Sequence, residues 1–280
     1  MGTVFYAANH VIGRGVHAEI PPVGLSFWRW FLGAVILLPF IMRDLIASSA
    51  IIKTNIRSLS LLGCTMLGST TLILIALNYA SAINISLINT TQPVMTVVLA
   101  WLIFREKLVR SQVIGIAAGL LGVLIMVSRV DWAIIAELDF NPGDFIALLA
   151  IVGYAFYAIN IRFIPRGLKP TVSLFVIIIT GCLGLLPFYI VETLLYRPFP
   201  VNMTSIVTVI ILALTTSLIG MLVWNEGNRI IGPSRAGMFI NLIPVFTAVF
   251  AITFLGEQLH LYHLSGALLI STGIFLVLRK

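Results

Sequence analysis

Long apolar runs follow one another along the whole chain, and most charged residues lie in the short segments between them. A helix needs about 20 consecutive apolar residues to cross the hydrocarbon core of a bilayer. Here 60% of the 280 residues are hydrophobic and 10% are charged, whereas soluble domains carry about 25% charged residues. The sequence therefore predicts an all-α integral membrane protein whose main partner is the lipid bilayer.

Ten such runs can be delimited by charge, proline or glycine, and they leave no room for a separate soluble domain. They cover residues 1–12, 24–42, 58–79, 83–104, 113–127, 145–161, 171–191, 203–223, 236–255 and 261–278. The first run is short, because a dozen residues give roughly 18 Å of helix against a hydrocarbon core near 30 Å. We therefore expect further residues upstream of Met1, either natively or lost by trimming.

Lys and Arg are distributed unevenly between the connections. When successive connections are assigned to alternate sides of the membrane, most of the 17 fall on one side, and Arg14, Arg129 and Arg197 fall on the other. The positive-inside rule makes the first side cytoplasmic. We expect a multi-pass protein of the plasma (inner) membrane with both termini in the cytoplasm. The net charge of +7 then reflects topology, and the absence of a basic stretch interleaved with aromatics argues against nucleic-acid binding.

The chain repeats itself at an offset of about half its length. GTVFYAAN at residues 2–9 matches GYAFYAIN at residues 153–160, and the run that begins at Pro93 matches the run that begins at Pro244. Each copy contains five runs, an odd number, so the second copy must enter the membrane from the opposite face. Inverted repeats of this kind are typical of transporters that expose a midplane site to each side in turn.

The predicted architecture is thus ten transmembrane helices in two inverted five-helix repeats around a central cavity. The repeats are assigned to residues 1–129 and 143–280. Residues 144–152 of the second copy have no counterpart ahead of Gly2, which is a second reason to expect an upstream extension.

In these motifs the chain resembles the EamA type of the drug/metabolite transporter superfamily. The resemblance lies in the opening GTVFYAANHVIGR, in QPVMTVVLAWLIFREKL, and in its echo IPVFTAVFAITFLGEQL. It implies ten helices, a cavity lined by spans 1, 3, 4, 6, 8 and 9, and export of small metabolites. Amino-acid exporters similar to YddG are the nearest functional comparison.

A polar segment interrupts the fourth run near its centre. Asn89, Thr90, Thr91 and Gln92 cover every face of a helical turn, so part of the segment must face the protein interior. Pro93 has no N–H to offer the carbonyl of Asn89. This pattern predicts a discontinuous helix whose Asn89 and Gln92 bind the solute; the alternative is a kink whose polar groups bond to neighbouring helices.

The ninth run has a weaker version of the same pattern. Asn241 aligns with Thr90, and Pro244 frees the carbonyl of Ile240. We predict Asn241 as a solute contact and both Pro93 and Pro244 as helix breaks.

Asn9 and Asn160 are equivalent under the repeat and could face one another across the cavity; the alternative is hydrogen bonding between helices. Other polar and aromatic candidates accompany them in the same runs: Tyr6, His10, Tyr154 and Tyr157. A proton-relay role for His10 competes with a packing role.

Tyr79 and Asn84 lie at one end of the third and fourth runs, and Trp224 lies at the end of the eighth. They could gate the cavity or hold a substrate ammonium, or they could form an interfacial belt. The belt is the preferred interpretation for Trp28, Trp30 and Trp101.

The remaining charged and small residues have structural interpretations. Glu106 and Glu257 each follow a run, where a carboxylate can cap a helix start, with proton coupling as the alternative. Arg29 is expected to reach the membrane interface or to pair with Glu19, rather than to bind a substrate carboxylate. Small residues in spans 5 and 10 would join the two halves or form a dimer. The glycines concerned are Gly115, Gly119, Gly122, Gly266 and Gly273.

No Asp or Glu lies in the middle of a run, which argues against a carboxylate proton relay and against a fixed deep charge for a strongly ionic solute. We expect an alternating-access exporter of small zwitterionic or neutral polar solutes, amino acids foremost, that acts as a monomer, with a dimer as the alternative. Carriers of nucleotide sugars or drugs, a channel and a lipid-acting enzyme are the competing classes. No metalloprotease, Ser-His-Asp, Walker or Cys/His pattern is found, so neither catalysis nor a metal or cofactor is expected.

Overall fold

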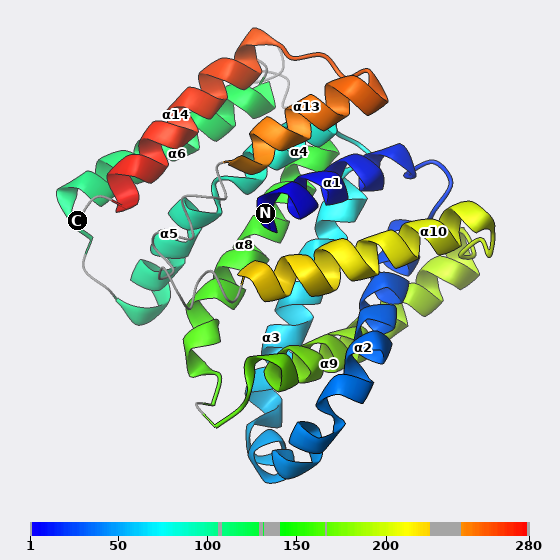
Figure 1. Cartoon of the computed structure of the whole chain (residues 1–280). Helices are drawn as coiled ribbons and strands as arrows, with labels where there is room; N and C mark the ends of the chain where they lie inside the picture. The colour runs from blue at the N-terminus through cyan, green and yellow to red at the C-terminus, as the bar shows by residue number, and fades with distance from the viewer. Residues whose placement is uncertain are drawn as a thin grey trace.

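The computed structural model describes residues 2–105, 108–128, 131, 141–165, 167–224 and 242–278, and every regular element within those ranges is a helix (Figure 1). The first half contains α1 (Gly2–Gly15), α2 (Pro22–Ala47), α3 (Ser49–Ala76), α4 (Ala82–Asn89), α5 (Gln92–Phe104) and α6 (Arg110–Ser128). The second half contains α8 (Pro142–Asn160), η1 (Ile161–Phe163), α9 (Pro170–Val191), η2 (Glu192–Tyr196), α10 (Met203–Leu212), η3 (Ala213–Gly220), α13 (Ile243–Leu255) and α14 (Leu261–Leu278).

Local sequence explains where several helices begin. Proline occupies the first turn of α2, α8 and α9, where its missing N–H is not needed. Side chains cap the starts of α4, α8 and α10: Ser81 accepts from the N–H of Asn84, Asn141 from that of Gly143, and Asn202 from that of Ser205.

Seven helical segments of the described ranges are long and apolar enough to cross a membrane. They are Pro22–Ala47, Ser49–Ala76, Ala82–Phe104, Arg110–Ser128, Pro142–Phe163, Pro170–Tyr196 and Met203–Trp224. The first helix, α1, has 14 residues and is short, as the sequence predicts. The predicted ninth run begins at residue 236, but residues 236–241 lie outside the described ranges, and α13 covers the remainder.

The turn between the second and third runs differs from the expectation. Residues 43–57 were expected to form a connection, yet α2 continues to Ala47 and α3 begins at Ser49. Arg43, Lys53 and Arg57 are exposed on these helical ends. Lys and Arg are good helix formers, so both helices extend beyond their apolar parts.

The principal helix contacts join the two halves of the chain. In the first group, α3 packs against α8 and α9, α5 against α8, and α6 against α14. The second half has corresponding contacts, since α13 packs on α1 as α5 packs on α8, and α10 packs on α2 as α3 packs on α9. The halves are therefore interleaved in one core.

Glycines bring α6 and α14 into backbone contact. A Cβ at Gly115 would lie 2.6 Å from the carbonyl oxygen of Gly273, and one at Gly122 would lie 2.9 Å from that of Gly266. Of the two uses that the sequence left open for these glycines, the structure shows the first, in which they join the halves within one chain.

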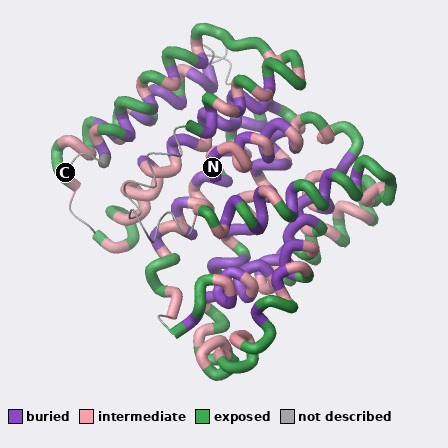
Figure 2. Tube along the Cα trace, viewed as in Figure 1, coloured by how far each residue is buried: buried purple, intermediate pink, exposed green. Residues whose placement is uncertain are grey.

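Burial separates two surfaces of most helices (Figure 2). The sides that face other helices are buried, whereas the outward sides expose large apolar residues. Phe40, Phe188, Phe254 and Leu268, for example, are 65–80% exposed. Soluble monomers rarely present such extensive apolar surface. This arrangement fits a bundle whose outer surface is covered by lipid.

Candidate substrate cavity

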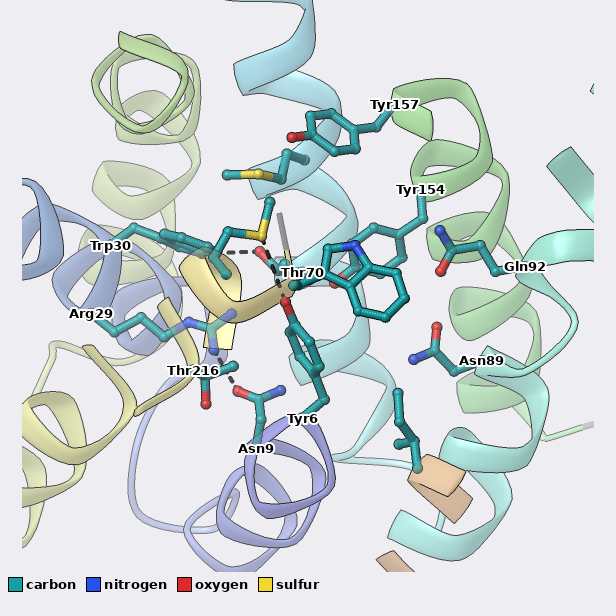
Figure 3. A pocket seen from close by; sticks show the side chains of 14 residues that line it. Tyr6, Asn9, Arg29, Trp30, Thr70, Asn89, Gln92, Tyr154, Tyr157 and Thr216 are labelled. Atoms are coloured by element: carbon teal, nitrogen blue, oxygen red, sulfur yellow. Dashed lines mark hydrogen bonds between the residues drawn. The ribbon is translucent and has the colours of Figure 1, made fainter. Parts of the chain in front are cut away.

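A cavity of about 120 Å³ is lined by residues of both halves of the chain (Figure 3). About 10–15 Å³ suffices for the centre of one water molecule, so the space can hold a small organic solute. Its lining comes from α1, α2, α3, the junction of α4 and α5, α8, η3 and the segment that follows it, and the start of α13. The residues are Tyr6, Asn9, Arg29, Trp30, Met66, Thr70, Asn89, Gln92, Tyr154, Tyr157, Thr216, Met221, Trp224 and Ile243.

The break between α4 and α5 brings polar side chains to the cavity. The helix is interrupted at Thr90 and Thr91, whose hydroxyls donate back to the carbonyls of the preceding turn at 2.6 and 2.7 Å. Asn89 and Gln92 are three residues apart and therefore share a face, which lines the cavity. The buried Oδ1 of Asn89 has no hydrogen-bond partner among the described residues.

Arg29 of α2 is a buried base in the cavity wall, with 1% of its surface exposed. Its Nη1 donates a hydrogen bond to Oδ1 of Asn9 on α1, and its guanidinium carbon lies 5.3 Å from the centroid of the Trp30 ring. Its Nε has no hydrogen-bond partner among the described residues. The cavity thus has a positive pole set by contacts between α1 and α2.

Aromatic residues form much of the remaining wall. The Trp30 indole N–H donates to the Thr70 hydroxyl at 3.1 Å, which fixes the ring against α3. Tyr6 and Trp224 meet edge to face with centroids 6.4 Å apart, and the Tyr6 hydroxyl donates to the Met221 sulfur at 3.6 Å. These contacts tie helices of both halves together around the cavity.

Two carboxylates of the second half hold helix starts of the first half. Glu257 accepts hydrogen bonds from the backbone N–H groups of Ala82 and Ile83, at 2.7 and 3.1 Å. Glu192 accepts from those of Val23 and Gly24, at 3.0 and 2.7 Å. We call these pairs of contacts the carboxylate clasps. Each satisfies N–H groups that a helix start leaves without an intrahelical partner.

A second cavity lies one helical turn further along α5 and α8. Gln92 lines the first cavity and Thr96 and Ala100 the second, and likewise Tyr154 lines the first and Ala158 and Arg162 the second. The positions within α5 and within α8 are spaced by four residues and share one face, and Arg162 follows in η1. The second cavity therefore lies beyond the first along these two helices, toward the end that bears Arg162.

Comparison with known families identifies the chain. The model of the EamA-like transporter family matches it twice, over residues 1–128 and 141–279. The chain belongs to the EamA-like transporter family. It is accordingly a membrane transporter, and the family membership suggested by the sequence motifs is confirmed.

Curated relatives of this EamA chain carry transporter names. The uncharacterized transporter YyaM of Bacillus subtilis is 26% identical over 98% of this chain and 88% of its own length. Probable amino-acid metabolite efflux pumps of Salmonella typhimurium and Escherichia coli are 25% and 24% identical, each over 98% of this chain and 91% of its own length.

A solved crystal structure resembles the EamA chain over its whole length. It covers 98% of this chain and 93% of the other, with a TM-score of 0.59 and 16% sequence identity. At that identity the likeness concerns the fold alone.

Six of the predicted site residues come together in the cavity of this EamA transporter. They are Tyr6, Asn9, Asn89, Gln92, Tyr154 and Tyr157. Pro93 lies in the first turn of α5, directly after the helix break, and Pro244 lies in the first turn of α13. The break between α4 and α5 directly precedes Pro93, as expected. The residues before Leu242 are not described, so the break expected at Pro244 stays a prediction.

The other predicted site residues lie elsewhere. Asn84 is buried but donates to Asp144 of α8, and Asn160 donates to the carbonyl of Phe156 in its own helix at 2.8 Å. Tyr79 is 55% exposed, and its carbonyl accepts from Asn141.

His10 and Asn241 complete the predicted set. The His10 side chain is 3% exposed and does not line the cavity, although its neighbour Asn9 does. Asn241 lies outside the described residues. Asn9 and Asn160 therefore do not face one another across the cavity, despite their equivalence in the repeat.

Two interpretations of α2 were wrong. Arg29 neither reaches an interface nor pairs with Glu19, and Trp30 is 3% exposed in the cavity wall rather than part of a belt. Span 2 thus joins the six spans that the family resemblance implies. A signal was available, because Arg29 is spaced by four residues from Leu25 and Gly33 and so shares the packed face of α2.

Glu257 has the capping role that the sequence predicted, but for a different helix. It holds the start of α4 rather than the start of α14, which follows it in the chain. A helix start can accept a carboxylate from any neighbouring element, so sequence proximity did not identify the partner. Glu106 lies outside the described residues.

Proposed function

We propose that this EamA-family transporter is an alternating-access exporter of small zwitterionic or neutral polar metabolites, amino acids foremost. Two inverted repeats, residues 1–129 and 143–280, form ten spans around the central cavity. The protein resides in the plasma (inner) membrane as a monomer, with both termini in the cytoplasm, as the Lys and Arg distribution favours.

The observation that carries this proposal is the composition of the cavity wall. Both halves contribute, and the wall combines amides, hydroxyls, aromatic rings and a helix break. A discontinuous helix at the interface of two repeats is the common site of substrate binding in secondary transporters. Rocking one half against the other would expose such a site to each side in turn.

In the proposed topology, a solute would approach the central cavity from the cytoplasmic face. The carboxylate clasps of Glu192 and Glu257 close helix starts at the face opposite Arg162 in the proposed topology. The second cavity, which Arg162 lines, extends toward the basic face. In the proposed orientation this face is cytoplasmic, so a cytoplasmic solute would reach the central cavity between α5 and α8.

The solute class follows from the size and charge of the cavity. Among the described lining residues, one arginine and several neutral polar groups suit a zwitterion better than a multiply charged nucleotide sugar. The names of the Salmonella and Escherichia coli relatives, probable amino-acid metabolite efflux pumps, support the same class. We expect transport without an enzymatic reaction.

Counterflow in proteoliposomes tests the proposal. Vesicles loaded with an unlabelled amino acid are expected to accumulate the radiolabelled amino acid transiently, with saturation, as a carrier does and an open channel does not. Asn89→Ala and Gln92→Ala should each raise the half-saturating concentration about tenfold, the effect of losing one or two hydrogen bonds to a charged solute group.

Asn160→Ala is the matched control, because it removes the same amide from a side chain that bonds to its own helix outside the cavity. It should transport as the wild type does. The proposal fails if no amino acid shows counterflow, or if the two cavity variants and the control behave alike. A saturable signal for a nucleotide sugar alone would favour that rival class.

A further inference from the structure

The structure assigns to Arg29 the recognition of a carboxylate group on the transported solute. The inference rests on the proposed transport function and makes it more specific: the solute is a small carboxylate, such as an amino acid, and the corresponding amine is a poor substrate.

Arg29 is buried within the helix bundle. An ionised side chain within a membrane bundle is costly unless an anion or several hydrogen-bond acceptors compensate it. Arg29 has 1% of its surface exposed, and it is one of the residues that line the cavity. Its compensation can therefore come from a molecule in the cavity.

The protein groups that contact Arg29 are uncharged. Asn9 supplies a neutral amide oxygen and Trp30 a ring face. Within the described residues no carboxylate forms an ion pair with Arg29, and its Nε–H has no acceptor. Arg29 therefore retains a donor without an acceptor and a positive charge that no described carboxylate pairs, in the wall of a space large enough for a solute.

The cavity wall opposite Arg29 carries amide side chains. Figure 3 shows Arg29 and Asn9 on one side of the cavity and Asn89 and Gln92 on the other, with Tyr6 between them. Asn89 Oδ1 is a buried acceptor without a partner among the described residues. A zwitterion complements both walls, because its carboxylate accepts from Arg29 and its ammonium donates to Asn89.

A purely structural role would leave Arg29 holding α1 to α2 through Asn9, without affecting which solutes bind. The two roles differ in selectivity, since only carboxylate recognition distinguishes a solute from its analogue that lacks the carboxylate. Selectivity is therefore the property to measure, in addition to transport rate.

The experiment measures competition for counterflow by matched compounds in proteoliposomes containing the full chain. The probes are leucine with leucinamide and isoamylamine, and phenylalanine with phenylalaninamide and phenethylamine. Wild-type protein should prefer each amino acid over its two analogues by about tenfold or more, as expected when a charge-assisted hydrogen bond is lost. Equal competition by amino acids and amines would overturn the inference, while transport itself would stand.

Variants then assign the selectivity to the residue. Arg29→Gln should weaken amino-acid competition by about tenfold or more and reduce the preference over the amide to near unity, whereas Arg29→Lys should keep the preference. Arg43→Gln makes the same charge change at an exposed position of α2 and should behave as the wild type does. A preference that persists in Arg29→Gln would overturn the inference. The wild-type comparison still tests it if Arg29→Gln fails to fold.

Discussion

The carboxylate of Glu257 accepts a hydrogen bond from the backbone N–H of Ala82 at 2.7 Å, although the two residues are 175 positions apart in the chain. The second oxygen accepts from the neighbouring N–H of Ile83. A side chain just beyond α13 thus completes the start of α4, the helix that ends at Asn89 in the cavity wall. The Glu257 clasp therefore links the connection after α13 to the helix that positions Asn89 in the cavity wall.

Glu257→Gln should destabilise this link. The variant loses the negative charge and offers one acceptor where two N–H groups need one each, so the free energy of unfolding should fall by about 1–3 kcal/mol. A thermal-shift assay in detergent would register this as a lower Tm. Glu19→Gln neutralises an exposed acid elsewhere and should leave the Tm unchanged; equal Tm values for both variants would contradict the capping role.

Gly63→Ala should disrupt the contact between α3 and α9. An added Cβ would meet the backbone carbonyl of Ile177 and lie 2.7 Å from the amide nitrogen of Gly181, and backbone atoms cannot rotate away. We expect a loss of about 1–3 kcal/mol in stability, measured by thermal unfolding.

Gly68→Ala is the matched control on the same helix, since a Cβ at that position meets no atom within 4 Å. Alanine also has the higher helix propensity, so this variant should be as stable as the wild type or more stable by up to about 1 kcal/mol. If Gly63→Ala were equally well tolerated, the close packing of α3 on α9 would be refuted.

Ala158→Phe should obstruct the second cavity. The position is on the face of α8 that lines both cavities, and a phenyl ring would occupy the space between α5 and α8. We expect the initial rate of amino-acid efflux from cells to fall to near background. Leu149→Phe adds a ring to the exposed side of the same helix and should keep normal efflux; normal efflux in Ala158→Phe would exclude this route.

Asp44→Asn should have little effect on stability. Lys169 lies 2.7 Å from Asp44, but both side chains are substantially exposed, at 64% and 35% respectively. Exposed ion pairs contribute about 1 kcal/mol at most, because water screens the attraction. A Tm drop as large as that of Glu257→Gln would show that this pair is more than a surface contact.

Patterns local in sequence predicted much of the fold. Apolar runs indicated most of the helices, Pro93 and its polar neighbours indicated the break between α4 and α5, and the repeated glycines indicated a close helix contact. Each depends on the chemistry of adjacent residues, such as a missing N–H or a missing Cβ, so each can be read without tertiary information.

Partners that are distant in sequence could not be predicted in this way. The amide side chain of Asn84 could bind a solute, but it donates a hydrogen bond to Asp144 of α8. Arg29 has the position of an interfacial residue, yet its contact with Asn9 directs it inward. In both cases the neighbour is decided by how helices pack, and no spacing within one run encodes that choice.

The glycine contact between α6 and α14 restricts how the bundle can change shape. With 2.6 Å from the carbonyl of Gly273 to a Cβ at Gly115, the two backbones have no intervening side chains whose rotation could let them slide. When the protein changes between conformations open to either side of the membrane, α6 and α14 must then move together as one rigid unit. The other helices would move relative to this pair. A disulfide crosslink between α6 and α14 should therefore leave the transport rate unchanged.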